Sequence, residues 1–436
     1  MSLIVKAGKA GKKVLRKFLP PPATHLSWTR RFERVQTKER ICAMTFDDGP
    51  FGLPAVPDEF GGRTLTDVLL DTLAEFGARG TFDVVGDTGD NYPDEAGKQG
   101  TAAWGGIRYD HYPDIHKDEF GGAVNNDRLI RRMIDEGHQI TVHGYRHIIF
   151  GKKNVVYGRR EVLGSVDKAL EDIRRLMDYL RDRYGCTVSM SRPAHYVDRI
   201  GDGFTSYDVY DRLGLQYMAA SYDGAGWLPS TLKDPKAALA AEIRAMEEPM
   251  ARALEQDPDA FCGQIIFQKD GYNMERRTPV AFGLRKQLEL LRKYGYRVVT
   301  VEELTRAYPF ADLGPEDPLF PRLRDLAEKY AVVYSDNRLR LEQIMTVGEL
   351  SMLLAPREDA LERRWALIRK SGSAHAYAGA MEYCLERGLL PAGTGPDAPL
   401  TALPEGLFDP VPDYRRRSVY AAFRDPGAAS EAEKAP

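Results

Sequence analysis

The sequence has little of what marks disulfide-rich, membrane-spanning or nucleic-acid-binding proteins. Its 436 residues include only four cysteines, without a C-x-x-C spacing, which excludes a dense disulfide framework. No apolar run reaches the roughly 18 residues that a transmembrane helix requires. The formal net charge of -3 argues against a general nucleic-acid-binding protein. A hydrophobic fraction of 43% over this length is enough for two domains with sizeable cores.

The N-terminal residues also lack the continuous apolar core of a secretory signal. Basic and apolar residues alternate from Leu3 to Leu19, and we interpret residues 1–37 as a basic arm. Two interpretations of this arm are open. One is an amphipathic helix on an anionic membrane surface, and the other is a solvated arm that ends at the prolines of residues 20–22.

The central part of the chain, from Arg40 to Leu304, alternates short apolar runs with stretches of helical periodicity, which favours a parallel sheet or barrel. In such folds the chemistry lies at the carboxyl ends of the strands. Strands are predicted at residues 41–46, 80–85, 139–143, 187–191, 217–221, 264–267 and 296–301. Helices are predicted at residues 65–76, 127–136, 160–183, 207–213, 235–254 and 279–294.

An insertion at residues 86–126 interrupts this alternation and is rich in glycine, aspartate and aromatic residues such as Trp104. A loop of this length beside a predicted active site is more often functional than accidental. Two roles are open for its aromatic side chains. They either stack on sugar rings and wall the cleft, or form a small core of the loop itself.

A domain boundary is predicted where glycine, proline and aspartate accumulate, around residues 309–318. It separates a first domain, residues 38–310, from a mostly helical domain, residues 311–424. Short helices are predicted in the second domain at residues 321–330, 347–354, 360–370 and 375–387. The tail, residues 425–436, is rich in alanine, glutamate, lysine and proline and is expected to be disordered.

The most informative residues are two adjacent carboxylates, Asp47 and Asp48, and two histidines four positions apart, His143 and His147. Both pairs lie at the ends of predicted strands, and if the chain turns helically after the second strand, the imidazoles share a face. Asp48 and the two histidines then make a candidate divalent-metal site whose three protein ligands leave room for water. A metal on Asp48 would leave Asp47 ionised as a general base for that water. The pattern indicates metal-assisted hydrolysis.

Six segments of this region resemble the polysaccharide deacetylases of carbohydrate esterase family 4, the NodB-homology domain. T-F-D-D-G-P at residues 45–50 matches that family's first motif, and H-G-Y-R-H at residues 143–147 is similar to its second. T-F-D-V-V-G at residues 81–86 resembles the family's T-F-F-x-x-G strand. The other segments are E-G-H-Q-I at 136–140, R-P-A-H-Y at 192–196 and D-G-A-G-W at 223–227. The similarity covers roughly residues 38–305.

The resemblance implies a distorted (β/α)7 barrel of the NodB-homology type and metal-dependent removal of N- or O-acetyl groups from a glycan. It implies that Asp48, His143 and His147 are the metal ligands and that Asp47 is the base, with a water on the metal as the nucleophile. Two imidazoles and a carboxylate suit zinc, and cobalt or nickel also fits.

Further roles follow from the same resemblance. Arg192 would hold Asp47 in place through a bidentate ion pair. The backbone N–H near Tyr196 would help to stabilise the oxyanion, and Trp227 would line the acetyl pocket. Asp223, in the same motif as Trp227, and Trp104, in the insertion, are further candidates for contact with the substrate.

Two positions depart from the family pattern. The fifth motif of the family carries a histidine that acts as general acid, but here the run I-F-Q-K-D at residues 266–270 places Lys269 there. The aspartate that normally tunes this histidine is replaced by Gly226. The acid is therefore open between Lys269, if burial near the metal makes its ammonium a better donor, and His195. The alternative function is a metal- and glycan-binding protein of the same fold that is catalytically weak or inactive.

The C-terminal region resembles surface-layer homology repeats. The segments that carry this resemblance are M-T-V-G-E-L at residues 345–350, and A-M-E-Y-C-L-E-R-G-L-L at residues 380–390 followed by P-L-T at 399–401. The resemblance implies binding to a cell-wall polymer, and the alternative is an accessory helical domain packed on the barrel. A glycan substrate favours the cell envelope, whereas the absence of a visible signal peptide leaves a cytoplasmic location open.

Overall fold

The computed structural model describes residues 24–52, 55, 59–87, 121–151, 162–273 and 277–425. The N-terminal arm up to residue 23, most of the insertion at 86–126 with Trp104, and the tail beyond residue 425 lie outside these ranges. Within them, no helix combines the length and the apolar character needed to cross a membrane.

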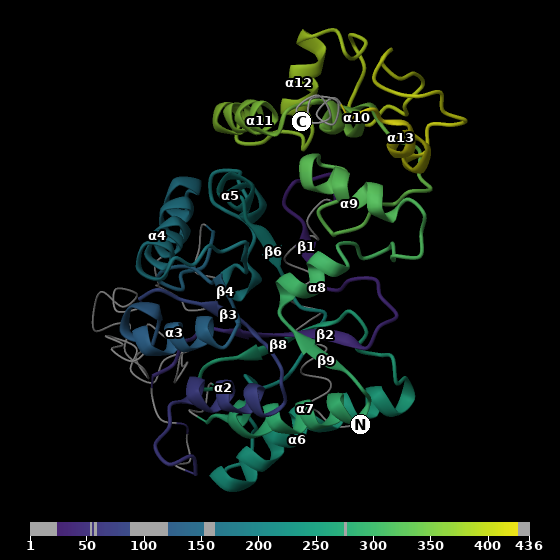
Figure 1. Cartoon of the computed structure of the whole chain (residues 1–436). Coiled ribbons are helices and arrows are strands. Elements are labelled where there is room, and N and C mark those ends of the chain that lie inside the picture. The colour runs from purple at the N-terminus through teal and green to yellow at the C-terminus, as the bar shows by residue number, and fades with distance from the viewer. Residues whose placement is uncertain are drawn as a thin grey trace, which may run out of the picture.

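A curled sheet of parallel strands forms the centre of the protein (Figure 1). Its strands are β1 (Arg31–Phe32), β2 (Ile41–Asp47), β3 (Thr81–Val84), β4 (Gln139–Val142), β5 (Met190–Ser191), β6 (Gln216–Met218), β7 (Tyr222–Asp223), β8 (Ile265–Lys269) and β9 (Arg297–Val299). Their order is β1-β6-β5-β4-β3-β2-β8-β7, and β9 pairs with the first residues of β2. Among the described strands, β1 and β7 do not pair with each other, so the barrel is open. The predicted distorted barrel of parallel strands is confirmed, with β1 and β7 as two short strands beyond the seven expected.

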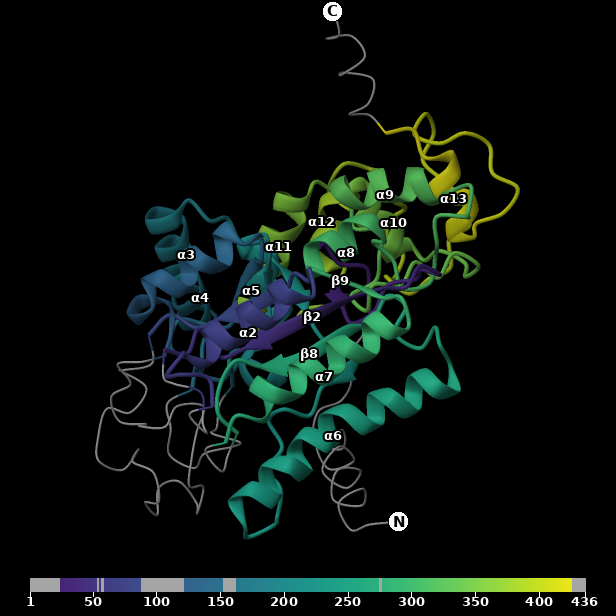
Figure 2. The ribbon, with the colours of Figure 1, turned by 60° about the horizontal axis from the view of Figure 1, so that its bottom comes forward.

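Helices surround this sheet, as the alternating pattern predicts; α6 and α7 lie along one side of β2 and β8 (Figure 2). The helices of this region are α2 (Leu65–Glu75), α3 (Asp127–Asp135), α4 (Val166–Tyr184), α5 (Ser206–Leu213), α6 (Pro235–Gln256), α7 (Pro279–Lys293) and α8 (Val301–Ala307). All residues of β2 are buried, which is the pattern of a central strand covered on both faces.

Side-chain caps account for two boundaries that differ from the prediction. Helix α4 begins at Val166 rather than at residue 160, because the Ser165 side chain accepts the Lys168 N–H and caps the helix there. The strand predicted to reach residue 301 ends at Val299, because Thr300 and Glu303 form a capping box that starts α8. The sequence prediction missed α8 for this reason.

The C-terminal region is helical and encloses a second hydrophobic core. Its helices are α9 (Phe320–Lys329), α10 (Val347–Leu354), α11 (Arg357–Ser371), α12 (Ala378–Glu386) and α13 (Arg416–Ala422). The first four overlap the helices predicted from the sequence, and α13 was not predicted. The second core begins at Phe310 but also contains Leu26, which comes from the opposite end of the described chain.

Residues 25–32 connect the two regions. Ser27 N–H donates to the Val333 carbonyl at 3.0 Å and Arg31 N–H donates to the Ser335 carbonyl at 2.8 Å. Arg31 and the next residue, Phe32, also form β1, which pairs with β6 of the barrel. One extended segment therefore lines both the helical region and the edge of the sheet.

Helix α11 packs against α4 and α5 of the barrel, as Figure 1 shows. The ring of Trp365 lies 4.6 Å from that of Phe204, centroid to centroid, and joins the core of the barrel. Arg364 pairs with Asp208, and Arg357 Nη2 donates to the Asp211 carbonyl at 2.7 Å. The contact between the two regions is therefore both apolar and charged.

We predict that Trp365→Ala destabilises the protein by about 3–5 kcal/mol, because a ring only 6% exposed would leave a cavity between the regions. Urea unfolding followed by circular dichroism measures the change. The matched control is Leu385→Ala, since Leu385 is 38% exposed and its truncation should cost no more than about 0.5 kcal/mol. Similar effects of the two substitutions would contradict the packing described here.

Candidate active site

The first pair of site residues lies at the carboxyl end of β2. Asp47 is the last residue of the strand, and Asp48 follows with a φ of 79°, in the left-handed region. The Asp48 N–H donates to the Asp83 carbonyl of β3, and the Asp47 carbonyl accepts the Asp270 N–H at 2.8 Å. These bonds hold the turn on both sides, so that the two adjacent carboxylates leave the strand in different directions.

Gly49 completes this turn for a steric reason. A Cβ atom at this position would lie 2.0 Å from Oδ2 of Asp270, whose carboxyl group is fully buried beside Thr66. Burial raises the pKa of Asp270 to about 8. Only glycine allows β2 to approach Asp270 this closely.

The histidines follow β4 at the same edge of the sheet. His143 is positioned by its N–H, which donates to the Val84 carbonyl at 2.8 Å. The chain does not turn helically after it, so the two imidazoles do not meet on a helix face: Gly144 has a φ of 93° and His147 a φ of 54°. A loop, held by the 2.8 Å bond from Tyr145 N–H to Asp172, brings the second imidazole back toward the first.

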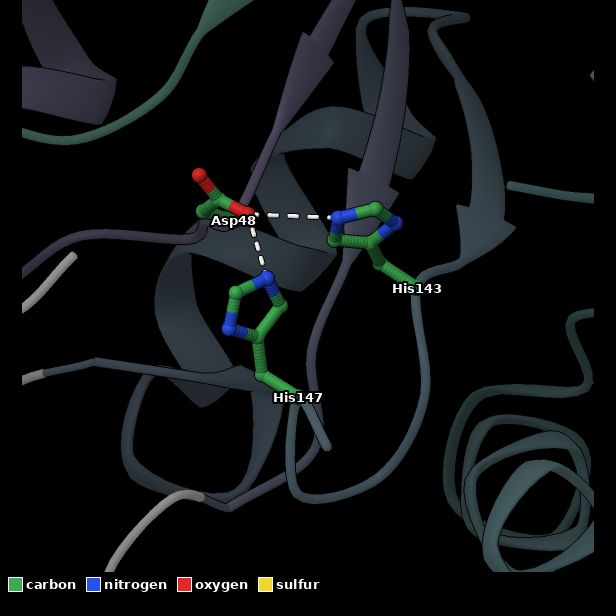
Figure 3. Close-up of side chains that lie close together, drawn as sticks. All are labelled: Asp48, His143 and His147. Atoms are coloured by element: carbon green, nitrogen blue, oxygen red, sulfur yellow. Dashed lines mark ion pairs between the residues drawn. The ribbon is translucent and has the colours of Figure 1, made fainter. Parts of the chain in front are cut away.

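Asp48, His143 and His147 converge on one point (Figure 3). Oδ1 of Asp48 lies 3.3 Å from Nε2 of His143 and 3.0 Å from Nε2 of His147. One donor atom from each residue lies within 4.8 Å of the others, and all three side chains are buried. A carboxylate oxygen and two imidazole nitrogens aimed at a common point fit a divalent cation, in chemistry and in spacing.

Asp47 lies beside this cluster and is paired with Arg192, a fully buried arginine that follows β5. A bidentate pair was predicted, but only Nη1 of Arg192 contacts the carboxylate. Nε donates to the Met218 carbonyl at 3.2 Å and Nη2 to the Ala219 carbonyl at 3.1 Å. Burial raises the pKa of Asp47 to about 6, although the Arg192 guanidinium opposes this rise.

Asp83 is a site residue that the sequence interpretation missed. It lies on β3 next to Asp47 in register, and its Oδ2 is 2.7 Å from Nδ1 of His143. Burial disfavours the charged imidazole of His143, but the carboxylates of Asp83, Asp48 and Asp47 raise its pKa well above the usual value. The signal for Asp83 was its charge in the middle of an apolar predicted strand.

Comparison with known proteins decides the family. Residues 34–195, which contain both motifs of the metal cluster, match the family model described as polysaccharide deacetylase. Residues 34–195 belong to the polysaccharide deacetylase family.

One curated relative is the peptidoglycan-N-acetylglucosamine deacetylase of Bacillus cereus. This chain is 25% identical to it over 293 residues, which cover 67% of this chain and 98% of the relative. The chain thus extends well beyond the aligned part, whereas the relative is covered almost completely.

Two solved structures are also similar to this deacetylase. The chitin deacetylase of the fungal pathogen Colletotrichum lindemuthianum is 21% identical, with a TM-score of 0.42 over 66% of this chain and 93% of that chain. A CE4 family pseudoenzyme of Bacillus anthracis is 12% identical, with a TM-score of 0.39 over 63% of this chain and 68% of that one. Similarities of this size do not bear on what this deacetylase binds.

Lys269 ends β8 directly opposite Asp47 in register. Its Nζ donates to Oδ2 of Asp48 at 2.7 Å, and the side chain is buried. The lysine that replaces the family histidine is therefore bound to a residue of the metal cluster through the oxygen that faces away from the imidazoles.

His195 and Tyr196 lie in a short turn after Arg192, both with positive φ values of 55° and 57°. The ring of His195 is 5.4 Å from that of His147, centroid to centroid, which places it beside the cluster. The Tyr196 N–H donates to the Pro193 carbonyl at 2.9 Å. The N–H of Tyr196 itself is thus already used within the turn, and the expected oxyanion donor near it stays a prediction.

Asp223 and Trp227 form a local unit at the end of β7. The Trp227 indole N–H lies 3.1 Å and 3.2 Å from the two carboxylate oxygens of Asp223, and both side chains are partly exposed. Gly226, which stands where the family pattern has an aspartate, is closely surrounded: a Cβ atom there would lie 3.1 Å from Oε1 of the buried Gln268. Gln268 thus occupies space beside the position where the family has its aspartate.

We predict that His147→Ala weakens binding of a divalent cation by more than the 10–100-fold loss typical of groups that only support a ligand. Isothermal titration of the metal-free protein with zinc, cobalt and nickel measures the affinity. The control is His375→Ala, which removes a histidine of the C-terminal region whose ring contacts Tyr377 instead. Equal affinities of the two variants would refute the assignment of the cluster.

Proposed function

We propose that this chain hydrolyses the N-acetyl groups of a polysaccharide, with N-acetylglucosamine units of peptidoglycan as the first substrate to test. The observation that carries the proposal is the buried cluster of Asp48, His143 and His147, with Asp47 held beside it by Arg192. The family of residues 34–195 supports the reaction class. The similarity to the Bacillus cereus enzyme supports the choice of glycan.

We propose zinc as the metal. Two imidazoles and a carboxylate are a common zinc donor set, and the same atoms would also accept cobalt or nickel. A divalent cation held by these residues would polarise a water molecule and the carbonyl oxygen of the acetyl group.

The remaining chemistry is carried by side chains. Asp47 accepts a proton from the attacking water as the water oxygen bonds to the acetyl carbon. Arg192 keeps the Asp47 carboxylate in place and charged. When the carbon–nitrogen bond breaks, the nitrogen takes a proton from an acid, and acetate and a free amine are released.

Lys269 and His195 are the two candidates for this acid. The Lys269 ammonium is bound to Asp48, on the opposite side of that carboxylate from the imidazoles. The His195 ring lies beside His147 and is partly exposed, which favours contact with a substrate. Trp227, oriented by Asp223, and the side chain of Tyr196 are proposed to contact the glycan.

The C-terminal helices are proposed to contact a cell-wall polymer. What supports this is the resemblance of two segments to surface-layer homology repeats, together with their position. The first segment lies beside the P-L-T that follows the second, with Thr346 bridged to Pro399 and Val347 N–H donating to the Ala398 carbonyl at 2.9 Å. In this arrangement the polymer-binding region packs on the enzyme body through α11.

Asp47→Asn should lower kcat by about 10²–10⁴-fold, because the amide cannot accept the proton of water. Acetate release from N-acetylated peptidoglycan fragments measures the rate. Zinc affinity, measured in parallel, should change little, since Asp47 is not one of the three proposed ligands. Full activity of the variant would refute the proposed base.

The pH profile of the wild-type enzyme provides the corresponding check. Asp47 acts only when ionised, and its pKa is raised to about 6 by burial. A cation bound nearby favours the charged form and moves this value down. Activity should therefore fall with decreasing pH along an acid limb at or below about pH 6, and the limb should be absent in residual Asp47→Asn activity.

Lys269→His tests the acid. If His195 or solvent supplies the proton in the natural enzyme, an imidazole at position 269 should raise the rate of acetate release. If the lysine is a dedicated donor, the substitution should abolish activity while zinc remains bound. His195→Gln is the matched variant: it should lose activity if His195 is the acid, and keep it if Lys269 or solvent supplies the proton.

A further inference from the structure

Asp83 is a buried charge in the middle of a parallel sheet. Its side chain is fully buried, and it is paired in register with Asp47 on one side and with Thr141 on the other. Paired residues of neighbouring parallel strands project to the same face, so the Asp83 carboxylate shares a face with Asp47. A buried carboxylate is costly unless nearby groups compensate it.

The two carboxylate oxygens of Asp83 have different surroundings. Oδ1 accepts a hydrogen bond from the Thr141 hydroxyl at 2.6 Å. Oδ2 makes no hydrogen bond of good geometry with any described residue, yet it lies 2.7 Å from Nδ1 of His143. The charge is thus directed at the imidazole rather than used within the sheet.

Nδ1 of His143 faces two acceptors, Oδ2 of Asp83 and the Arg192 carbonyl oxygen at 2.8 Å. Two acceptors at one ring nitrogen require that this nitrogen carries the proton. The lone pair of the neutral ring is then on Nε2, the atom that faces Asp48. A nearby negative charge also makes this lone pair a stronger donor to a cation.

The backbone of the same strand holds both proposed ligands. The Asp83 carbonyl accepts the Asp48 N–H at 3.3 Å, and the Val84 carbonyl accepts the His143 N–H at 2.8 Å. The carboxylate of Asp83 is therefore fixed relative to both residues by the strand that carries it. Residue 83 is phenylalanine in the T-F-F-x-x-G pattern that this segment resembles, so the carboxylate is a feature of this chain.

We infer that Asp83 is a positioning residue of the metal centre, which fixes the Nδ1-protonated form of His143 and strengthens its Nε2 as a ligand. This inference rests on the proposed function, since it assumes that the cluster binds a divalent cation. In this assignment Asp83 acts on the cation through His143, although Asp47, Asp83 and His143 also bring ligand atoms within 4.8 Å of one another.

The test is the zinc affinity of the full chain with Asp83→Asn, measured by competition with a chromophoric chelator. The amide keeps the size of the side chain and an oxygen for Thr141 but removes the charge. We expect binding to weaken 10–100-fold. At saturating zinc, the KM for the glycan should equal that of the wild type, because Asp83 acts only through His143.

Two further variants keep the test decisive. Asp211→Asn removes another buried carboxyl group, one whose neighbours are Thr29 and the arginines of α11, and it should leave zinc affinity within twofold of wild type. Thr141→Val keeps the charge of Asp83 but removes the hydroxyl that holds its Oδ1 in place. Thr141→Val should therefore weaken zinc binding several-fold, and it serves as the test if Asp83→Asn does not fold.

The outcomes separate the two proposals. If wild type binds zinc and folded Asp83→Asn binds it equally well, the inference on Asp83 is wrong and the proposed function stands. If Asp83→Asn does not fold and Thr141→Val binds zinc as tightly as the wild type, the inference on Asp83 is likewise wrong. If wild type itself binds no zinc, cobalt or nickel, the proposed function fails.

Discussion

Compensation of buried charge at the end of β2 is the constraint on which the site depends. Asp47, Asp48 and Asp83 bring three carboxylates together in surroundings that exclude most water. Such a concentration of negative charge is tolerated only where cations are placed against it. Arg192 and Lys269 supply them from β5 and β8, one on each side of the strand.

This compensation explains why the ends of several strands meet so closely. The guanidinium of Arg192 is bound to Asp47 but also to the carbonyls of Met218 and Ala219, so it connects β2 with the end of β6. The ammonium of Lys269 likewise connects β8 with the turn at Asp48. The charged residues thus hold the carboxyl edge of the open barrel together while they prepare a position for a cation.

The sequence predicted the parts of the fold that depend on regular patterns. Short apolar runs such as residues 41–46 are buried strands because both of their faces are covered, and the helical stretches have one apolar side. The carboxylates and histidines were identifiable because metal-assisted hydrolysis uses such side chains, and in parallel α/β folds they lie at strand ends. Residues 34–195 contain these motifs and match the family that they resemble.

What the sequence did not predict depends on contacts between distant residues. The loop at residues 143–147 brings the two imidazoles together without a helical turn, because Gly144 and His147 adopt left-handed conformations that no periodicity indicates. The partners of Asp83 and Lys269 come from other strands, and strand register is not visible in one sequence. The short strand β1 was missed because only two residues form it, and its stability comes from neighbours on both sides.

The position of residues 25–32 means that the two regions of this protein cannot be separated cleanly. A chain of separable modules can gain or lose its last module without disturbing the first. Here the earliest described residues supply Leu26 to the core of the final helices and β1 to the rim of the barrel. The helical region therefore shares its core with the segment that also forms the edge strand of the barrel, so removing the helices would strip Leu26 of its apolar surroundings a few residues before β1.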